Sequence, residues 1–429
     1  MTNNLIDKRR RLLGPNMSLF YDDPVHLVRG QGVWVFDADG RKYLDCYNNV
    51  PHVGHCHPHV VEAIAKQAAT LNTHTRYLHD GILSYAERLT AKFDDPLSSM
   101  IMVCTGSEAN DIALRMAEAV TGKRGIIVTD HTYHGNTTAV AALSSTNRAS
   151  TSQTDHIRFV PAPDSYRPPH DMTPEQHAAD FARHVENAID DLERSGIGFA
   201  GLLICPFFAN EGFPDLPENW LDPTVKAVKN AGGLLIADEV QPGFGRIGSH
   251  MWGHQYQGFT PDVVTLGKPM GNGHPVAAVI TTDDIISAFR TSFRYFNTFG
   301  GNPVSVAAAN AVLDVIETEN LMDNADRVGA YAKAELSRLS ETHPIIGNVR
   351  GKGLFFGTEL VLDKSNKTPA TDIANQVANL MRQNGILMNK LGIHYNTTKM
   401  RPPMPFSMEN ADLMIEVFDH VLSQVESTL

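Results

Sequence analysis

A lysine and an acid follow two apolar segments of this sequence. Residues 233–240 read GLLIADEV, an expected strand that ends at Asp238, and residues 263–265 read VVT, an expected strand that leads to Lys268. Strands buried on both faces belong to parallel sheets, and ligands bind beyond the carboxyl ends of such strands. A lysine held there is desolvated, which lowers its pKa toward that of a reactive neutral amine. The two positions therefore indicate a site where an amine and a carboxylate act together.

Each of these residues also has a plainer interpretation. Lys268 lies in the Gly-rich run KPMGNG, and strand-end loops of this kind usually leave a lysine in solvent. Asp238 is equally suited to capping a helix. Pro269 is expected to prevent a helix after the lysine. As a pair, lysine and acid are what a pyridoxal phosphate site needs, because the lysine binds the cofactor aldehyde and the carboxylate keeps the pyridine nitrogen protonated.

The segments around this pair resemble the class III (ω-type) aminotransferases, which are pyridoxal-phosphate enzymes of fold type I. The run DEVQ begins at Asp238, GFGR occupies residues 243–246, and the spacing from Asp238 to Lys268, 268 − 238 = 30, is that of the family. The resemblance extends over nearly the whole chain. It implies an α/β fold whose large domain has a mostly parallel central sheet flanked by helices, with a smaller α+β domain built from the N- and C-terminal segments.

The same resemblance implies where the domains lie. Residues 1–55 are expected to form part of the small domain, residues 56–310 the large cofactor-binding domain, and residues 311–429 the C-terminal small domain. A hairpin is expected over residues 32–46, because an Asp-Gly turn signal at residues 39–40 separates two β-rich runs.

Composition limits the possible partners and the compartment. The chain has 429 residues, 42% of them hydrophobic and 20% charged, which is typical of a large globular enzyme subunit. Its 36 basic and 48 acidic residues give a net charge of −12, which argues against nucleic-acid and anionic-membrane partners but allows a small anionic substrate in a locally positive pocket. The four cysteines show no framework spacing and the N-terminus has no apolar signal core, so a cytoplasmic protein is expected.

The cofactor phosphate is expected at the start of a helix over residues 111–120. The run TGSEAN places a glycine and a hydroxyl there, and free N–H groups with the helix dipole favour an anion. By the resemblance, Gly106 and Ser107 bind this phosphate, and an ordinary helix cap is the alternative. The run NTFGGNP matches a family motif in which the threonine, here Thr298, reaches the cofactor phosphate of the other subunit. The resemblance thus implies an obligate homodimer with shared sites.

The cofactor ring is expected to lie against another motif of the family, Tyr-His-Gly. Here this motif begins at Tyr133, whose ring is expected to stack on the pyridine, and His134 is counted with it among the cofactor-binding residues. Gln241 is expected to donate a hydrogen bond to the ring oxygen of the cofactor.

Changes in the substrate pocket indicate a single anionic substrate. Arg76 stands in the run LNTHTRYLHD, in a loop that is usually apolar or aromatic in the family, and an arginine fork suits phosphate or carboxylate. A surface pair between Arg76 and Asp80 is the alternative. Family members often bind the α-carboxylate with an arginine three residues before a Pro-Pro pair, which is Lys399 here. A glutamate in the family can neutralise that arginine, and its position is occupied here by Cys205. Both residues of the family's pair are therefore replaced.

The runs NNVPHVGHCHP, LNTHTRYLHD and GKPMGNGHPV resemble one branch of the family, the phospholyases. This branch implies elimination of phosphate from O-phosphoethanolamine, a small anionic amine, giving acetaldehyde, ammonia and inorganic phosphate. Besides Arg76 and Lys399, the residues expected to contact the substrate phosphate are Lys390, Arg401, Asn49 and Tyr21.

Three alternatives remain open. The first is elimination from a larger phosphorylated amine such as phosphohydroxylysine, and the second is amino transfer from an amine to a keto acid such as pyruvate. A non-catalytic homologue is disfavoured because Lys268, Asp238, Gln241 and Thr298 are all present.

Four histidines and a cysteine lie within residues 52–59, which raises the question of a zinc site. Tetrahedral zinc sites normally recruit a second pair of ligands further along the chain. The resemblance instead makes this run a structural turn before a helix over residues 60–71, and no metal is expected.

Overall fold

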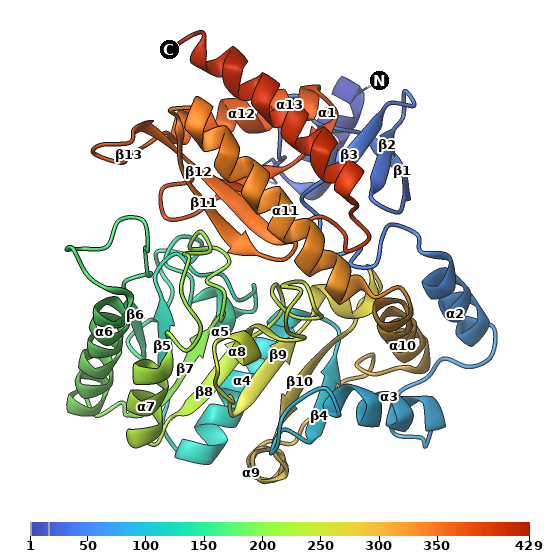
Figure 1. Ribbon diagram of the computed structural model, residues 1–429. Coiled ribbons are helices and arrows are strands. Elements are labelled where there is room, and N and C mark those ends of the chain that lie inside the picture. The colour runs from blue at the N-terminus through green and yellow to red at the C-terminus, as the bar shows by residue number, and fades with distance from the viewer. Residues whose placement is uncertain (1, 16–17) are drawn as a thin grey trace.

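The computed structural model describes residues 2–15 and 18–429. In Figure 1 a seven-stranded sheet with its helices forms the lower part of the molecule, and two smaller sheets with the terminal helices form the upper part. This arrangement confirms the expected α/β fold with a mostly parallel sheet. Across the described residues, no helix combines the length and the apolar character needed to cross a membrane.

The seven-stranded sheet has the order β4-β10-β9-β8-β7-β5-β6, and β10 alone runs against its neighbours. Its strands are β4 (Ser99–Val103), β5 (Gly125–Thr129), β6 (Ile157–Val160), β7 (Phe199–Ile204), β8 (Leu234–Asp238), β9 (Val263–Leu266) and β10 (Ala277–Thr281). The helices of this part are α4 (Gly106–Thr121), α5 (Thr138–Ala141), α6 (Pro174–Arg194), α7 (Asp222–Asn230), α8 (Gly253–Tyr256) and α9 (Asp283–Ser292). Every residue of β7, β8 and β9 is buried, as expected for strands covered on both faces.

The upper part is built from both ends of the chain. One sheet joins β1 (Leu27–Gln31), β2 (Trp34–Asp37) and β3 (Lys42–Asp45) to β14 (Ile386–Leu387), and the other contains β11 (Ile346–Lys352), β12 (Phe355–Asp363), β13 (Thr368–Pro369), β15 (Asn389–Leu391) and β16 (Thr397–Lys399). The helices here are α1 (Thr2–Leu13), α11 (Leu321–Thr342), α12 (Thr371–Gln383) and α13 (Met408–Glu426). The parallel pairing of β14 with β3 closes the expected small α+β domain.

Three further helices cover the side of the large sheet nearest β4: α2 (Pro58–Ala68), α3 (Asp80–Thr90) and α10 (Pro303–Thr318). Proline starts two of them, since Pro58 and Pro303 occupy first-turn positions where no backbone donor is needed.

The expectation that Pro269 prevents a helix after the lysine is wrong. Residues Lys268–Gly271 form a single 3₁₀ turn, η1, with Pro269 in its first turn. The proline ring removes no hydrogen bond there, because first-turn N–H groups have no acceptor within the helix. The turn ends at Asn272, whose left-handed backbone is tolerated by asparagine.

Candidate active site

Lys268 and Asp238 meet at the carboxyl edge of the large sheet. Asp238 is the last residue of β8, Lys268 opens the turn after β9, and these two strands are parallel neighbours. Both residues line one cavity together with Gly106, Tyr133 and Cys205. The cavity thus collects residues that follow β4, β5, β7, β8 and β9, which is where an open α/β sheet binds its ligands.

The amine of Lys268 is poised to react. Burial, reinforced by the positive charge of Arg401, lowers the pKa of Lys268 to about 8, although Asp238 and Cys205 oppose the shift. No ion pair or hydrogen bond holds this ammonium among the residues that the structure describes. A neutral amine is therefore accessible near physiological pH, as the interpretation of Lys268 as a nucleophile required.

Asp238 is held as a buried carboxylate. Its Oδ2 lies 2.6 Å from Nδ1 of His134 and accepts from Nδ2 of Asn110 at 3.0 Å, while its Oδ1 accepts from the Val240 N–H at 3.0 Å. Burial by itself raises the pKa of Asp238, but the hydrogen bonds from His134 and Val240 and the charge of Lys268 outweigh it, so the net pKa is lowered. The acid is thus ionised and oriented for a cationic partner.

Asn110 is a positioning residue that sequence reasoning missed. It is fully buried on α4, donates to the backbone oxygen of His134 at 2.7 Å, and accepts from Thr265 Oγ1 at 2.7 Å. Together with its bond to Asp238, these contacts tie α4, β8 and β9 together at the acid. A polar residue on the otherwise apolar buried face of α4 was the signal that could have identified it.

The start of α4 forms one wall of the cavity. Thr105 and Glu108 form a capping box, so the first-turn N–H groups of Gly106 and Ser107 are left without an acceptor inside the helix. Gly135 crosses Ser107 so closely that a Cβ built on the glycine would lie 2.5 Å from Ser107 Oγ. The free N–H groups of this first turn could bind an anion, and the assignment of the cofactor phosphate to Gly106 and Ser107 stays a prediction.

Two buried cations converge on Gln241 at another wall. The Lys399 ammonium donates to Gln241 Oε1 at 3.1 Å, and Nη1 of Arg401 donates to the same oxygen. Burial, with the charges of Arg401 and Lys268, holds the pKa of Lys399 well below its usual value. Neither cation forms a salt bridge within the described residues, so a neutral amide oxygen is their shared acceptor. The Nε2 of Gln241 faces Asn210 Oδ1 at 3.4 Å, which leaves this donor weakly engaged.

An acid lies near this wall although Cys205 occupies the position at which the resemblance implies a glutamate. Glu211 is 4% exposed; its Oε1 accepts from Thr129 Oγ1 at 2.5 Å and its Oε2 accepts from the Asn210 N–H at 3.0 Å. Its charge acts to raise the pKa of Lys399, against the larger effect of burial. The sequence interpretation missed it because the loop after β7 carries the carboxylate six residues beyond Cys205.

Arg76 and Thr298 lie outside this cavity, and the two segments that carry them are in contact. The guanidinium carbon of Arg76 stacks 3.7 Å from the centroid of Phe296, two residues before Thr298. Both Arg76 and Thr298 are exposed, and the surface around them includes Leu78, 97% exposed, and Phe299, 69% exposed. The alternative pairing of Arg76 with Asp80 is not formed in the described part of the chain.

The other three residues predicted to contact the substrate phosphate are also outside the lining of the cavity. The Tyr21 hydroxyl donates to Met388 O at 2.8 Å, and the Lys390 ammonium donates to Thr371 O at 3.3 Å. Asn49 is 1% exposed, and its Nδ2 has no hydrogen-bond partner. The structure therefore places Lys399 and Arg401 behind the cavity wall, where both bind the lining residue Gln241, whereas Tyr21, Lys390 and Asn49 make no hydrogen bond to a lining residue in the described part of the chain.

The histidines of residues 52–59 bind four separate partners. His52 contacts Phe244 O at 2.7 Å. The others meet three different carboxylates: His55 contacts Asp45, His57 contacts Glu319, and His59 contacts Asp314. These contacts fix the run between the two parts of the molecule.

The residues around the cavity fit pyridoxal phosphate. A partly neutral lysine, an ionised acid held by His134 and the free N–H groups of α4 match its aldehyde, its ring nitrogen and its phosphate. The ring of Tyr133 lines the cavity and is 40% exposed, which leaves an aromatic face available for stacking.

Comparisons with known proteins agree with this fit. Residues 20–422 match the family model described as aminotransferase class-III. The chain is 43% identical over 434 residues to alanine–glyoxylate aminotransferase 2-like of Drosophila melanogaster, covering 98% of this chain and 87% of that one. It is 37% identical over 435 residues to ethanolamine-phosphate phospho-lyase homolog 1 of Caenorhabditis elegans, covering 98% and 93%.

A solved structure is similar throughout. It is described as a phospholyase from Arthrobacter in complex with phosphoethanolamine, and it aligns with a TM-score of 0.93 and 41% identity over 98% of this chain and 99% of that one. By its fold, the match over nearly all of its length and the lysine–acid cavity at the sheet edge, this chain belongs to the class III aminotransferases, a pyridoxal-phosphate-dependent family.

Proposed function

We propose that this protein is a phospholyase that eliminates phosphate from O-phosphoethanolamine. The observation that carries the proposal is the pair Lys399 and Arg401, two buried cations that share the neutral oxygen of Gln241 and form no salt bridge in the described structure. Such cations are destabilising unless an anion joins them. A phosphate dianion next to Lys268 would supply that anion, and a simple uncharged amine would not.

The reaction consumes one water and yields acetaldehyde, ammonia and inorganic phosphate. When bound, pyridoxal phosphate supplies an electron sink for the bond that breaks at the amine-bearing carbon. Lys268 takes the proton from that carbon, acting as general base with its lowered pKa. The C–O bond on the neighbouring carbon then breaks and the electron pair leaves with phosphate, which Lys399 and Arg401 stabilise. Water hydrolyses the remaining enamine.

Asp238 and His134 support this sequence of steps from the other side of the cavity. The Asp238 carboxylate would accept a hydrogen bond from the protonated ring nitrogen of the cofactor and keep that nitrogen protonated, and His134, 2.6 Å away, fixes the orientation of the carboxylate. Phosphate is a far better leaving group than hydroxide. Elimination therefore outruns the return of the proton that amino transfer would require.

Known relatives support elimination and also leave amino transfer open as an alternative reaction. The phospho-lyase homolog of C. elegans and the Arthrobacter phospholyase with phosphoethanolamine favour elimination. The D. melanogaster relative bears an aminotransferase name, as does alanine–glyoxylate aminotransferase 2 of Homo sapiens at 35% identity, which favours amino transfer to a keto acid. A larger phosphorylated amine such as phosphohydroxylysine remains the alternative within the elimination reaction.

We further propose a homodimer whose two sites are shared. Arg76 and Thr298 are exposed, adjoin each other through Phe296, and lie outside the lysine cavity of their own chain. The exposed Leu78 and Phe299 make the same surface apolar, as expected of an interface core. In the dimer this surface places Thr298 at the cofactor phosphate and Arg76 at the substrate phosphate of the partner.

One incubation separates the two reactions. Purified protein loaded with pyridoxal phosphate is mixed with O-phosphoethanolamine, no keto acid is added, and inorganic phosphate is measured. Steady release of phosphate with equimolar acetaldehyde is the expected result. Loss of the cofactor's aldehyde absorbance without phosphate release, followed by its recovery on adding pyruvate, would show amino transfer instead. Parallel assays with phosphohydroxylysine rank the two phosphorylated amines by kcat/KM.

A further inference from the structure

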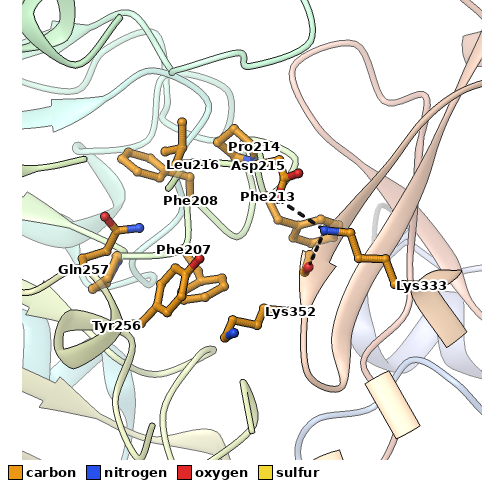
Figure 2. A pocket seen from close by; sticks show the side chains of 12 residues that line it. Phe207, Phe208, Phe213, Pro214, Asp215, Leu216, Tyr256, Gln257, Lys333 and Lys352 are labelled. Atoms are coloured by element: carbon orange, nitrogen blue, oxygen red, sulfur yellow. Dashed lines mark hydrogen bonds and ion pairs between the residues drawn. The ribbon is translucent and has the colours of Figure 1, made fainter. Parts of the chain in front are cut away.

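A second cavity lies behind the active-site wall, where the large domain meets the C-terminal part of the chain. It has a volume of about 130 Å³ and is separate from the cavity of Lys268. The loop of residues 206–216 and Tyr256 at the end of α8 form one side, and α11 and β11 form the other through Lys333 and Lys352 (Figure 2).

One side of this second cavity is aromatic. Phe207, Phe213 and Tyr256 line it, and the Phe207 and Tyr256 rings lie with their centroids 5.4 Å apart. Phe355 packs behind them, 5.1 Å from Phe213 and 6.2 Å from Phe207. This side offers a fixed apolar surface to a flat ligand.

The facing side carries two lysines in different states. Lys333 is engaged, since its ammonium donates to Gly351 O at 3.1 Å and lies 3.4 Å from Asp215 Oδ1. Lys352 has no hydrogen bond or salt bridge within the described residues, and its ammonium lies 5.0 Å from the centroid of the Tyr256 ring. Figure 2 shows this ammonium on the same side of the Lys352 side chain as Tyr256. The second cavity thus holds one cation that is free to bind an anion.

Gln257 adds an unpartnered acceptor to the lining. The residue is 2% exposed, and its buried Oε1 has no hydrogen-bond partner among residues 2–15 and 18–429. A buried acceptor without a donor is destabilising, and a ligand that brings a donor to it relieves part of that destabilisation. A ring hydroxyl or N–H on the flat ligand would serve.

The loop between the two cavities faces both of them. Pro206, Phe207 and Phe213 line the second cavity, whereas Asn210 lines that of Lys268. Ala209 O accepts from Lys399 at 3.5 Å, at the limit of a hydrogen bond. A ligand that moves the loop therefore also moves the groups around Lys399.

The backbone of this loop is strained. Phe208 and Phe213 have φ angles of 46° and 39°, in the left-handed region that bulky residues rarely adopt. The conformation persists because both rings are buried, at 1% exposure each. Backbone strain of this kind persists only where the surrounding packing holds it, so a ligand against Phe207 and Phe213 acts on the packing that sets this backbone.

From these observations we infer that the second cavity is an effector site for a small aromatic anion, with the ring against Phe207 and Tyr256 and the anionic group on Lys352. Occupancy acts on the Lys268 cavity through the loop of residues 206–216. The inference concerns a site apart from the reacting groups, so it stands whether the enzyme eliminates phosphate or transfers an amino group.

The probe is 4-fluorobenzoate, followed by the ¹⁹F linewidth as holoenzyme is added. Binding on the order of 1 mM is expected for a ligand of this size. Lys352→Met keeps the length of the side chain and removes the charge, and it should weaken binding about fivefold or more. Lys352→Arg should retain binding. Lys226→Met, at an exposed lysine of α7, is the matched control and should bind as the wild type does.

Three results would overturn the inference. Equal broadening in wild type and Lys352→Met, or broadening lost in Lys399→Met and kept in Lys352→Met, would place the probe elsewhere. The effector role is read from the rate at which the apoprotein takes up pyridoxal phosphate, measured by absorbance. That rate should change with 4-fluorobenzoate in the wild type and not in Lys352→Met, and an unchanged rate at saturating probe in the wild type would refute it.

Discussion

The Lys399 ammonium lies 3.1 Å from Oε1 of Gln241, although 158 positions separate the two residues in sequence. Arg401 donates to the same oxygen, so one amide accepts from two buried cations. In that arrangement Gln241 has its Nε2 directed away from the cations, toward Asn210. The glutamine that was predicted to donate to the cofactor therefore also positions the groups that we assign to the substrate phosphate.

Replacing Lys399 tests this assignment. We expect Lys399→Met to lower kcat/KM for O-phosphoethanolamine by about 100-fold, since a charge-assisted contact to phosphate is lost in a buried site. The loss should appear mainly in KM if the contact forms in the ground state. Lys390→Met is the control, because that ammonium binds the Thr371 backbone away from the cavity. An unchanged kcat/KM in Lys399→Met would remove this residue from the phosphate site.

The same variant should be more stable than the wild type as apoprotein. Burial lowers the pKa of Lys399, so this ammonium binds its proton more tightly in the unfolded chain than in the folded protein. At pH values below the folded-state pKa, the buried charge therefore lowers the free energy of unfolding. This loss of stability diminishes as the pH rises from the folded-state pKa toward the ordinary value of 10.5. The Tm advantage of Lys399→Met should therefore be present at pH 7 and shrink toward pH 10. A Tm advantage of Lys399→Met that grows with pH would contradict the lowered pKa of Lys399.

The pH dependence of cofactor loading reports on Lys268. Its amine must be neutral to attack the aldehyde, so the rate of loading of the apoprotein should rise with pH and level off above about pH 8. An amine of ordinary pKa, such as N-acetyl-lysine amide, should continue to gain rate up to about pH 10 under the same conditions. A protein curve that follows the model amine would show that Lys268 is not desolvated.

Asp238→Asn should lower turnover by at least about 100-fold, because a neutral amide does not hold the ring nitrogen in its protonated form. Single-turnover phosphate release measures the effect. Asp262→Asn is a matched control on the same sheet, since this acid accepts from the Leu235 N–H at 2.8 Å and lies outside the cavity. Similar losses in both variants would indicate a packing defect rather than a role for Asp238.

Mixed subunits test the shared site. Arg76→Ala and Lys268→Ala should each be nearly inactive alone. When the two are unfolded and refolded together, half of the dimers are hybrids, each with one intact site, and about a quarter of the wild-type activity should return. Thr298→Ala paired with Lys268→Ala should show partial recovery of cofactor binding in the same experiment. No recovery from either pair, with dimers confirmed by light scattering, would place Arg76 and Thr298 in the site of their own chain.

Local signals in the sequence were enough to predict that Asp238 and Lys268 meet at one edge of the sheet. Asp238 and Lys268 each follow a short apolar strand, and neighbouring parallel strands bring their carboxyl ends to one edge whatever the rest of the chain does. The start of α4 was predicted too late, at residue 111, whereas the helix begins at Gly106, so that the glycine and hydroxyl expected before the helix form its first turn.

Tertiary structure alone decided which side chains meet from distant elements. Glu211, Asn110 and the shared acceptor on Gln241 depend on how loops and helices pack over the sheet, and a carboxylate or amide in a loop carries no sequence signal of burial. Tyr21 and Lys390 show the reverse case, since their types suited a phosphate site while packing directed them to the backbone oxygens of Met388 and Thr371. Sequence thus determined what each strand end carries, and packing determined which charges face one another, because charge pairing depends on distances in space that local sequence patterns do not encode.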